Sequence, residues 1–91
     1  MARLDMDDFA LGTEIVRVYL AAGLSEAKRV EATLDGAGVI YGVEVETLVG
    51  SDGLGLRSER SAAGFWVEET VVKTAFDALS KAGLVAGLVR L

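Results

Sequence analysis

Runs of alternating and helically spaced apolar residues divide most of the chain into six expected elements. Four runs are rich in β-branched, aromatic or aliphatic residues and predict strands. Two runs repeat their apolar residues every three to four positions and predict helices. The expected strands are residues 14–21, 39–49, 65–68 and 84–91, and the expected helices are residues 25–37 and 72–82. The order is strand, helix, strand, strand, helix, strand.

The two halves of this pattern repeat each other. Gly38 and Gly83 each follow a predicted helix at the position where a left-handed glycine usually ends it. Leu34 and Leu79 each stand four residues before that glycine. At the start of the first helix, Ser25 is the expected N-cap. Two such halves predict an α+β fold of the ferredoxin-like βαββαβ type.

In that fold both helices cover one face of a four-stranded antiparallel sheet, and the first and third strands are central neighbours. Residues 14–91 form this single domain, and residues 1–13 precede it as an acidic arm. Residues 50–64 are rich in Gly and Ser and predict a long loop, the most mobile internal segment of the domain.

Composition excludes several kinds of chemistry. The chain has 91 residues, a formal net charge of −5, and neither Cys nor His. The chain therefore lacks the commonest transition-metal ligands. It can form no disulfide and no Ser-His or Cys-His nucleophile pair from its own residues. The acidic balance disfavours nucleic acid and anionic membranes as partners. With no long apolar run and no basic, apolar start, we expect a cytoplasmic domain that binds no nucleic acid or membrane.

The sheet face away from the helices is the first candidate site. Strand alternation places Arg17, Tyr19 and Trp66 on it, together with Glu44 and its acidic neighbours Glu46 and Glu68. Stable monomers seldom expose two large aromatic rings side by side, so we expect this face to bury Tyr19 and Trp66 in a homo-oligomer. Edge-to-edge pairing through the second or the fourth strand is the competing geometry.

The Gly-rich loop is the second candidate. Arg57 and Arg60 within it are two groups able to pair with a small anionic ligand or an acidic partner protein. No nucleotide-binding glycine motif accompanies them. The carboxylates of the open face, and those of the arm, are expected to be solvated charges, since nothing on a wet surface raises a carboxyl pKa. We therefore expect no catalytic residues, no metal site and no cofactor.

Short motifs resemble those of a family of prokaryotic signal transducing proteins with a PII-like, ferredoxin-like fold. They are Arg17-Val18-Tyr19, Leu24-Ser25-Glu26-Ala27, Leu34-Asp35-Gly36-Ala37-Gly38-Val39 and Trp66-Val67-Glu68-Glu69. The likeness spans residues 15–82. It implies that the loop after the second strand carries ligand and partner contacts.

These observations favour a non-catalytic module that senses a small ligand or binds a partner protein through residues 50–64 and the open sheet face. Two other interpretations stay open. One is a purely structural homo-oligomerisation domain, and the other is a small dimeric enzyme of the ferredoxin-like kind.

Overall fold

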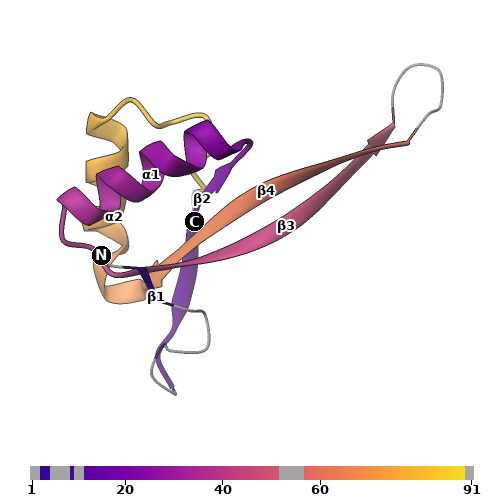
Figure 1. Ribbon diagram of the computed structural model, residues 1–91. Coiled ribbons are helices and arrows are strands. Elements are labelled where there is room, and N and C mark those ends of the chain that lie inside the picture. The colour runs from indigo at the N-terminus through magenta and orange to yellow at the C-terminus, as the bar shows by residue number, and fades with distance from the viewer. Residues whose placement is uncertain (1–2, 5–8, 10–11, 52–56, 90–91) are drawn as a thin grey trace.

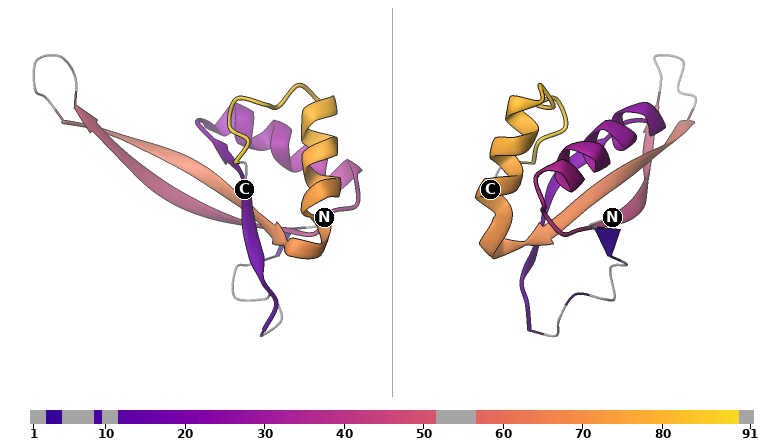
Figure 2. Two further views of the ribbon diagram at one scale, coloured as in Figure 1. Left: turned by 180° about the vertical axis from the view of Figure 1, so that it is seen from behind. Right: turned by 60° about the vertical axis from the view of Figure 1, so that its left-hand side comes forward.

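The computed structural model describes residues 3–4, 9, 12–51 and 57–89. It has the expected α+β class, with two helices on one face of a four-stranded sheet (Figures 1 and 2). The elements are β1 (Arg3–Leu4), β2 (Ile15–Ala21), α1 (Leu24–Gly36), β3 (Tyr41–Ser51), β4 (Arg57–Glu68), the 3-10 turn η2 (Glu69–Val71) and α2 (Val72–Lys81). The strand order is β1-β3-β4-β2. β2 and β4 pair antiparallel, so these two strands are neighbours as predicted, but β2 lies at the edge of the sheet and not at its centre.

The sheet is mixed, whereas an antiparallel sheet was predicted. Its fourth strand comes from the N-terminal residues: Arg3 pairs with Tyr41 and Leu4 with Gly42, parallel to β3. The Arg3 guanidinium lies 3.8 Å from a Glu31 carboxylate oxygen on α1. Two residues of the segment 1–13 thus add to the edge of the sheet. Asp5, Asp7 and Asp8 of the acidic arm lie outside the described residues.

The predicted strand at residues 84–91 is not formed as a regular strand. One isolated bridge joins Leu88 to Tyr19, and the Leu20 amide donates to the Gly87 carbonyl at 2.8 Å. The Leu88 amide also donates to the Val85 carbonyl at 3.3 Å, which closes a turn. This turn keeps the segment from extending before it reaches β2. The C-terminal segment therefore lies along β2 without completing a strand in the described residues.

Both helices end in the same way, as the internal repeat predicts. Gly38 and Gly83 have φ of 70° and 78°, a region that favours glycine. The next amide in each case donates to a leucine carbonyl five residues back: Val39 to Leu34 at 3.0 Å and Leu84 to Leu79 at 2.9 Å. These bonds satisfy carbonyls at the helix ends. At the other end of α1 the N-cap is Gly23, with no side-chain capping bond, so the prediction of Ser25 as N-cap was wrong.

A β-bulge in β2 changes which side chains face the helices. Arg17 lies opposite Trp66, but Tyr19 lies opposite the next residue, Phe65, so Val18 is the extra residue. Strand alternation therefore shifts by one after Arg17. Tyr19 is 1% exposed and belongs to the core. The prediction that Tyr19 lies on the open face was wrong, because period-two alternation contains no signal for a bulge.

The core lies between the sheet and the two helices. Its members come from β2, α1, β3, β4 and α2 and from the residue that follows each helix-ending glycine. They are Val18, Tyr19, Ala21, Ala27, Val30, Leu34, Val39, Tyr41, Phe65, Val67, Ala75, Leu79 and Leu84. The rings of Tyr41 and Phe65 have centroids 5.8 Å apart and are tilted by 49°. Each large side chain buried in this way contributes roughly 1.5–3 kcal/mol.

The predicted loop at residues 50–64 is largely strand. β3 runs to Ser51 and β4 begins at Arg57, with an uninterrupted register from Tyr41↔Val67 to Ser51↔Arg57. Only residues 52–56 between them lie outside the described residues. Backbone pairing does not need large side chains, so a segment with the composition of a loop completes the hairpin. β3 and β4 extend beyond the body of the domain (Figure 1).

The overall dimensions reflect this projection. The radius of gyration is 14.0 Å, against about 12 Å for a compact domain of this length. β2 pairs with β4 only as far as Ala21↔Ala63. The six pairs from Glu46↔Ala62 to Ser51↔Arg57 form a two-stranded extension, which we call the ribbon.

Packing of the C-terminal segment predicts the effect of a single methyl group. A Cβ atom at Gly87 would lie 2.6 and 2.8 Å from two ring carbons of Tyr19 and even closer to the Leu20 carbonyl oxygen. We expect Gly87→Ala to lower the free energy of unfolding by about 1–3 kcal/mol, because ring and backbone must both move. Thermal unfolding followed by circular dichroism measures this.

The matched control is Gly36→Ala, at the end of α1, where a Cβ atom would meet nothing within 4 Å. This variant should be as stable as the wild type or slightly more so, because alanine is the better helix residue. Equal stability of the two variants would show that Gly87 does not hold the C-terminal segment against Tyr19.

Candidate functional site

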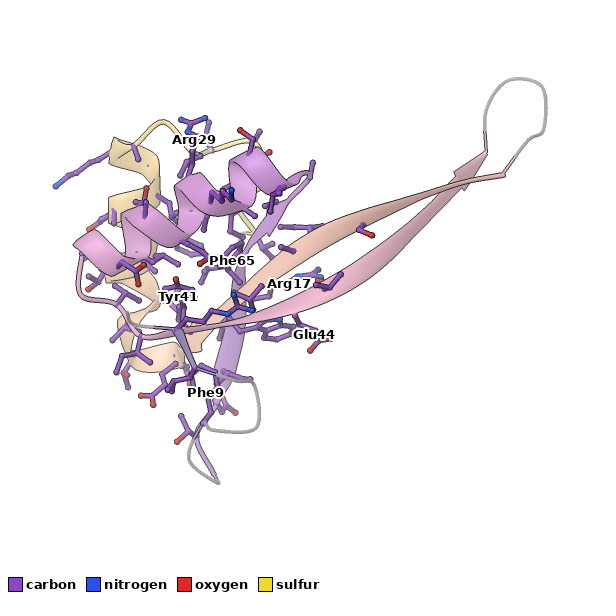
Figure 3. All side chains as sticks on the ribbon, in the orientation of Figure 1. Phe9, Arg17, Arg29, Tyr41, Glu44 and Phe65 are labelled. Atoms are coloured by element: carbon purple, nitrogen blue, oxygen red, sulfur yellow. The ribbon has the colours of Figure 1, made fainter. Side chains whose placement is uncertain are left out.

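The open sheet face carries an ion pair at the base of the ribbon. The Nη1 atom of Arg17 on β2 lies 2.7 Å from both carboxylate oxygens of Glu46 on β3. The two side chains are 33% and 26% exposed. Strand β4 runs between β2 and β3, so the pair crosses the central strand of the sheet. Figure 3 shows Arg17 near Glu44 where the ribbon leaves the body.

Gly64 makes this arrangement sterically feasible. A Cβ atom there would lie 3.3 Å from Arg17 Cδ and 3.4 Å from Trp66 Nε1, and closer still to a Glu46 carboxylate oxygen. The ion pair thus lies directly over the backbone of Gly64. Trp66 stands beside it, and its Nε1 atom is buried without a hydrogen-bond acceptor among the described residues. A buried donor of this kind is not available to a ligand.

The structure brings together three of the predicted site residues. Arg17, Trp66 and Glu44 all lie on the open face, because Arg17↔Trp66 and Glu44↔Gly64 are opposite pairs in the register. Tyr19 does not join them. Arg57 and Arg60 belong to β4, where they lie opposite Ser51 and Leu48, and their side chains lie outside the described part of the structure.

Burial of Tyr19 weakens the case for an aromatic docking surface on this face. Only Trp66 of the two predicted rings remains there, and it is partly covered. Its neighbours Arg17 and Glu46 already satisfy each other's charge. The open face is therefore a polar surface around one half-buried ring.

An apolar cavity of about 180 Å³ lies on the helix side of the ribbon's base. It is lined by the end of β2, the start of α1 and both ribbon strands, with Ala21, Leu24, Ala27, Val45 and Ala62 among its residues. Leu24 and Val45 at its margin are 73% and 72% exposed. A small apolar side chain would fit there.

A second, polar cavity of about 400 Å³ lies between the start of α1 and the C-terminal segment. Tyr19, Ser25, Glu26 and Arg29 line one side, and Gly83, Leu84 and Ala86 the other. The Tyr19 hydroxyl donates a hydrogen bond to Glu26. Burial first, and then this bond, raise the pKa of Tyr19, so the hydroxyl is protonated at neutral pH. Sequence reasoning missed this site because it depends on the bulge in β2.

Two exposed carboxyls, those of Glu14 and Glu69, interact with each other. Glu69 is hydrogen-bonded to Glu14, and this bond raises the Glu69 pKa, with repulsion from Glu14 as the second cause. The pair is fully solvated, so it has no pocket in which to bind a substrate. The described residues also contain no group of three or more acidic side chains able to hold a metal ion. Within them, no helix is long and apolar enough to cross a membrane.

The ion pair over Gly64 predicts a measurable coupling. In a double-mutant cycle of Arg17→Met and Glu46→Gln, we expect a coupling free energy of about 0.5–1 kcal/mol that falls as salt is added, since both groups are partly solvated. Urea unfolding measures it, and Trp66, the only tryptophan, reports it by fluorescence. Strictly additive effects at low salt would mean that the pair is not formed.

The Glu14–Glu69 pair predicts that removing one carboxyl stabilises the fold in a pH-dependent way. A carboxyl whose pKa is raised in the folded state favours folding at low pH, and that contribution is lost as pH rises through the folded-state pKa. Glu14→Gln removes the repulsion, so it should raise the melting temperature at pH 7 and leave it unchanged near pH 3. Asp77→Asn, at an exposed position of α2, is the control for charge removal elsewhere. Equal gains in melting temperature at both pH values would contradict repulsion between Glu14 and Glu69 as the cause.

The chain was compared with known protein families, curated proteins and solved structures. No protein family model matches it, and neither a curated protein nor a solved structure is significantly similar to it.

Proposed function

We propose that this domain is a protein-interaction module rather than an enzyme, and that the ribbon is its binding element. The observation that carries this proposal is the extension of the β3–β4 ladder by six pairs beyond the last pair of β2. In the described structure, no helix or further strand accompanies those pairs. The body of the domain does not need them for its core.

An isolated two-stranded ribbon is marginally stable in water, and a third strand or a packed face stabilises it. A partner that pairs with or packs on the ribbon would supply this. Both outer edges of the ribbon carry unpaired backbone amides and carbonyls, which are a template for strand addition. The apolar cavity at the ribbon's base offers a place for a side chain of the incoming segment.

The topology and the sequence resemblance support the same proposal. We infer a ferredoxin-like arrangement, in which the C-terminal segment beside β2 takes the place of the fourth strand and β1 is an addition at the opposite edge. The resemblance to PII-like signal transducing proteins implies that partner contacts lie after the second strand of that arrangement. The ribbon occupies that position.

Small-ligand sensing is the second candidate function, and the polar cavity beside Tyr19 favours it. Its volume of about 400 Å³ falls in the range of small-molecule sites. It combines an arginine, a carboxylate and a tyrosine hydroxyl. Native mass spectrometry of protein purified gently from cells would reveal a retained ligand, and loss of that ligand in Arg29→Ala would place it in this cavity.

Photo-crosslinking tests the binding role of the ribbon. A photoreactive residue is introduced in place of Ser61, which is exposed on β4, or of Ser80, which is exposed on α2. In the native cells we expect adducts from position 61 at several times the yield from position 80, because only the ribbon contacts a partner. Equal yields at the two serines would overturn the proposal.

A further inference from the structure

We infer that the partner of the ribbon is a second copy of this chain, and that the two copies pair antiparallel through the edge of β3 with Thr47 facing Thr47. This inference rests on the proposed function and names its partner. It follows from the length of the free edge, from the symmetry of strand pairing and from the charges along β3.

The free edge of β3 begins where β1 ends. β1 covers Tyr41 and Gly42, and in the described structure no strand pairs with the same side of β3 from Val43 to Ser51. The charged residues of this edge are Glu44 and Glu46, and its sequence holds no other feature that usually blocks pairing. Residues 43–51 contain no Lys, Arg or Pro, and the β3–β4 register contains no bulge. An edge of this kind pairs readily with another strand.

Symmetry fixes the register. In an antiparallel pair, opposite residues point to the same face, while neighbours along one strand point to opposite faces. A two-fold axis between identical strands must therefore set one residue opposite its own copy. The nine residues from Val43 to Ser51 have Thr47 at their centre. When Thr47 lies opposite Thr47 of the second copy, every residue of the free edge lies opposite a residue of the other free edge.

The same rule disfavours the free edge of β4. Beyond Ala63, where β2 ends, its unpaired residues run from Arg57 to Ala62. This even number of residues has no central residue, so no two-fold register pairs them all. Two arginines lie in the segment, and positive charge is a common means of blocking an edge. A β3-to-β4 contact between copies would repeat without closing and would give filaments.

Charge is compatible with the β3 register. Glu44 falls opposite Gly50 of the second copy, and Glu46 falls opposite Leu48, so no two carboxylates are directly opposed. The two copies of Glu46 are diagonal neighbours, about 7–8 Å apart at Cα. Each is paired with its own Arg17 at 2.7 Å, which neutralises the repulsion. The ion pair on the open face thus reduces the negative charge that would otherwise oppose pairing of two copies of β3.

Sedimentation of the full chain is the first test. We expect a monomer–dimer equilibrium for the wild type. For Thr47→Lys, which sets like charges opposite each other, we expect a dimer dissociation constant at least about fivefold higher. Thr74→Lys on the exposed side of α2 is the matched control and should dimerise as the wild type does. A wild type that is monomeric at the highest attainable concentration, or that forms filaments, overturns the inference.

Cysteine crosslinking tests the register, because the chain has no cysteine of its own. Thr47→Cys would place two thiols opposite each other, at a Cα separation of about 4.5–5.5 Å that allows a disulfide. Val45→Cys would place the two thiols four residues apart along the paired strands, about 13 Å from each other, which is too far for a disulfide. We expect mild oxidation to link the first variant and not the second. The reverse result, or equal linkage, overturns the register.

The two proposals fail differently. A monomeric wild type whose position-61 probe still captures a heavier protein in cells would retain the ribbon as the binding element and eliminate the second copy. A dimer that persists unchanged in Thr47→Lys would likewise eliminate the β3 edge as its interface. Equal photo-crosslinking from Ser61 and Ser80 would instead eliminate the ribbon.

Discussion

The bulge in β2 between Arg17 and Tyr19 decides how the two faces of the sheet are used. Before the bulge, Arg17 points to the open face and pairs with Glu46. After it, Tyr19 enters the core, where Gly87 packs against its ring and its hydroxyl reaches Glu26 on α1. One extra residue, Val18, thus connects the sheet to the first helix and to the C-terminal segment. Without it, alternation would place the tyrosine in solvent and the core would lose one of its largest side chains.

The second consequence of the architecture is a division between a packed body and an uncovered ribbon. The body contains the helices and the core, and in the sheet order β1-β3-β4-β2 its central strands are β3 and β4. The ribbon begins where β2 ends, and the described residues provide nothing to cover it. Hydrophobic burial therefore stabilises the body, whereas the described contacts of the ribbon are its cross-strand pairing and the Arg17–Glu46 ion pair at its base. This uncovered element is the part of the domain for which we propose a binding role.

The chemistry of the chain agrees with this division. Lack of His and Cys removes the usual general bases and nucleophiles. The interacting carboxyls of Glu14 and Glu69 are solvated and lie outside the described cavities. The strongest ion pair, Arg17 with Glu46, is internally satisfied and partly covers Trp66. The described polar groups thus interact with one another at the surface of the domain.

Local signals in the sequence determined the helices and their C-terminal ends: apolar spacing marks α1 and α2, and Gly38 and Gly83 supply the left-handed residue that each C-terminus needs. They also placed Arg17, Glu44 and Trp66 on one face, because alternation holds as long as the register is regular. Tertiary structure alone decided the rest. A bulge depends on the partner strand, so burial of Tyr19 was not visible in β2. The ribbon is held by cross-strand backbone bonds, to which Gly, Ser and Ala contribute no recognisable pattern. β1 pairs with the edge of β3, and the C-terminal segment lies along the edge of β2. No pattern in their own residues specifies these partners.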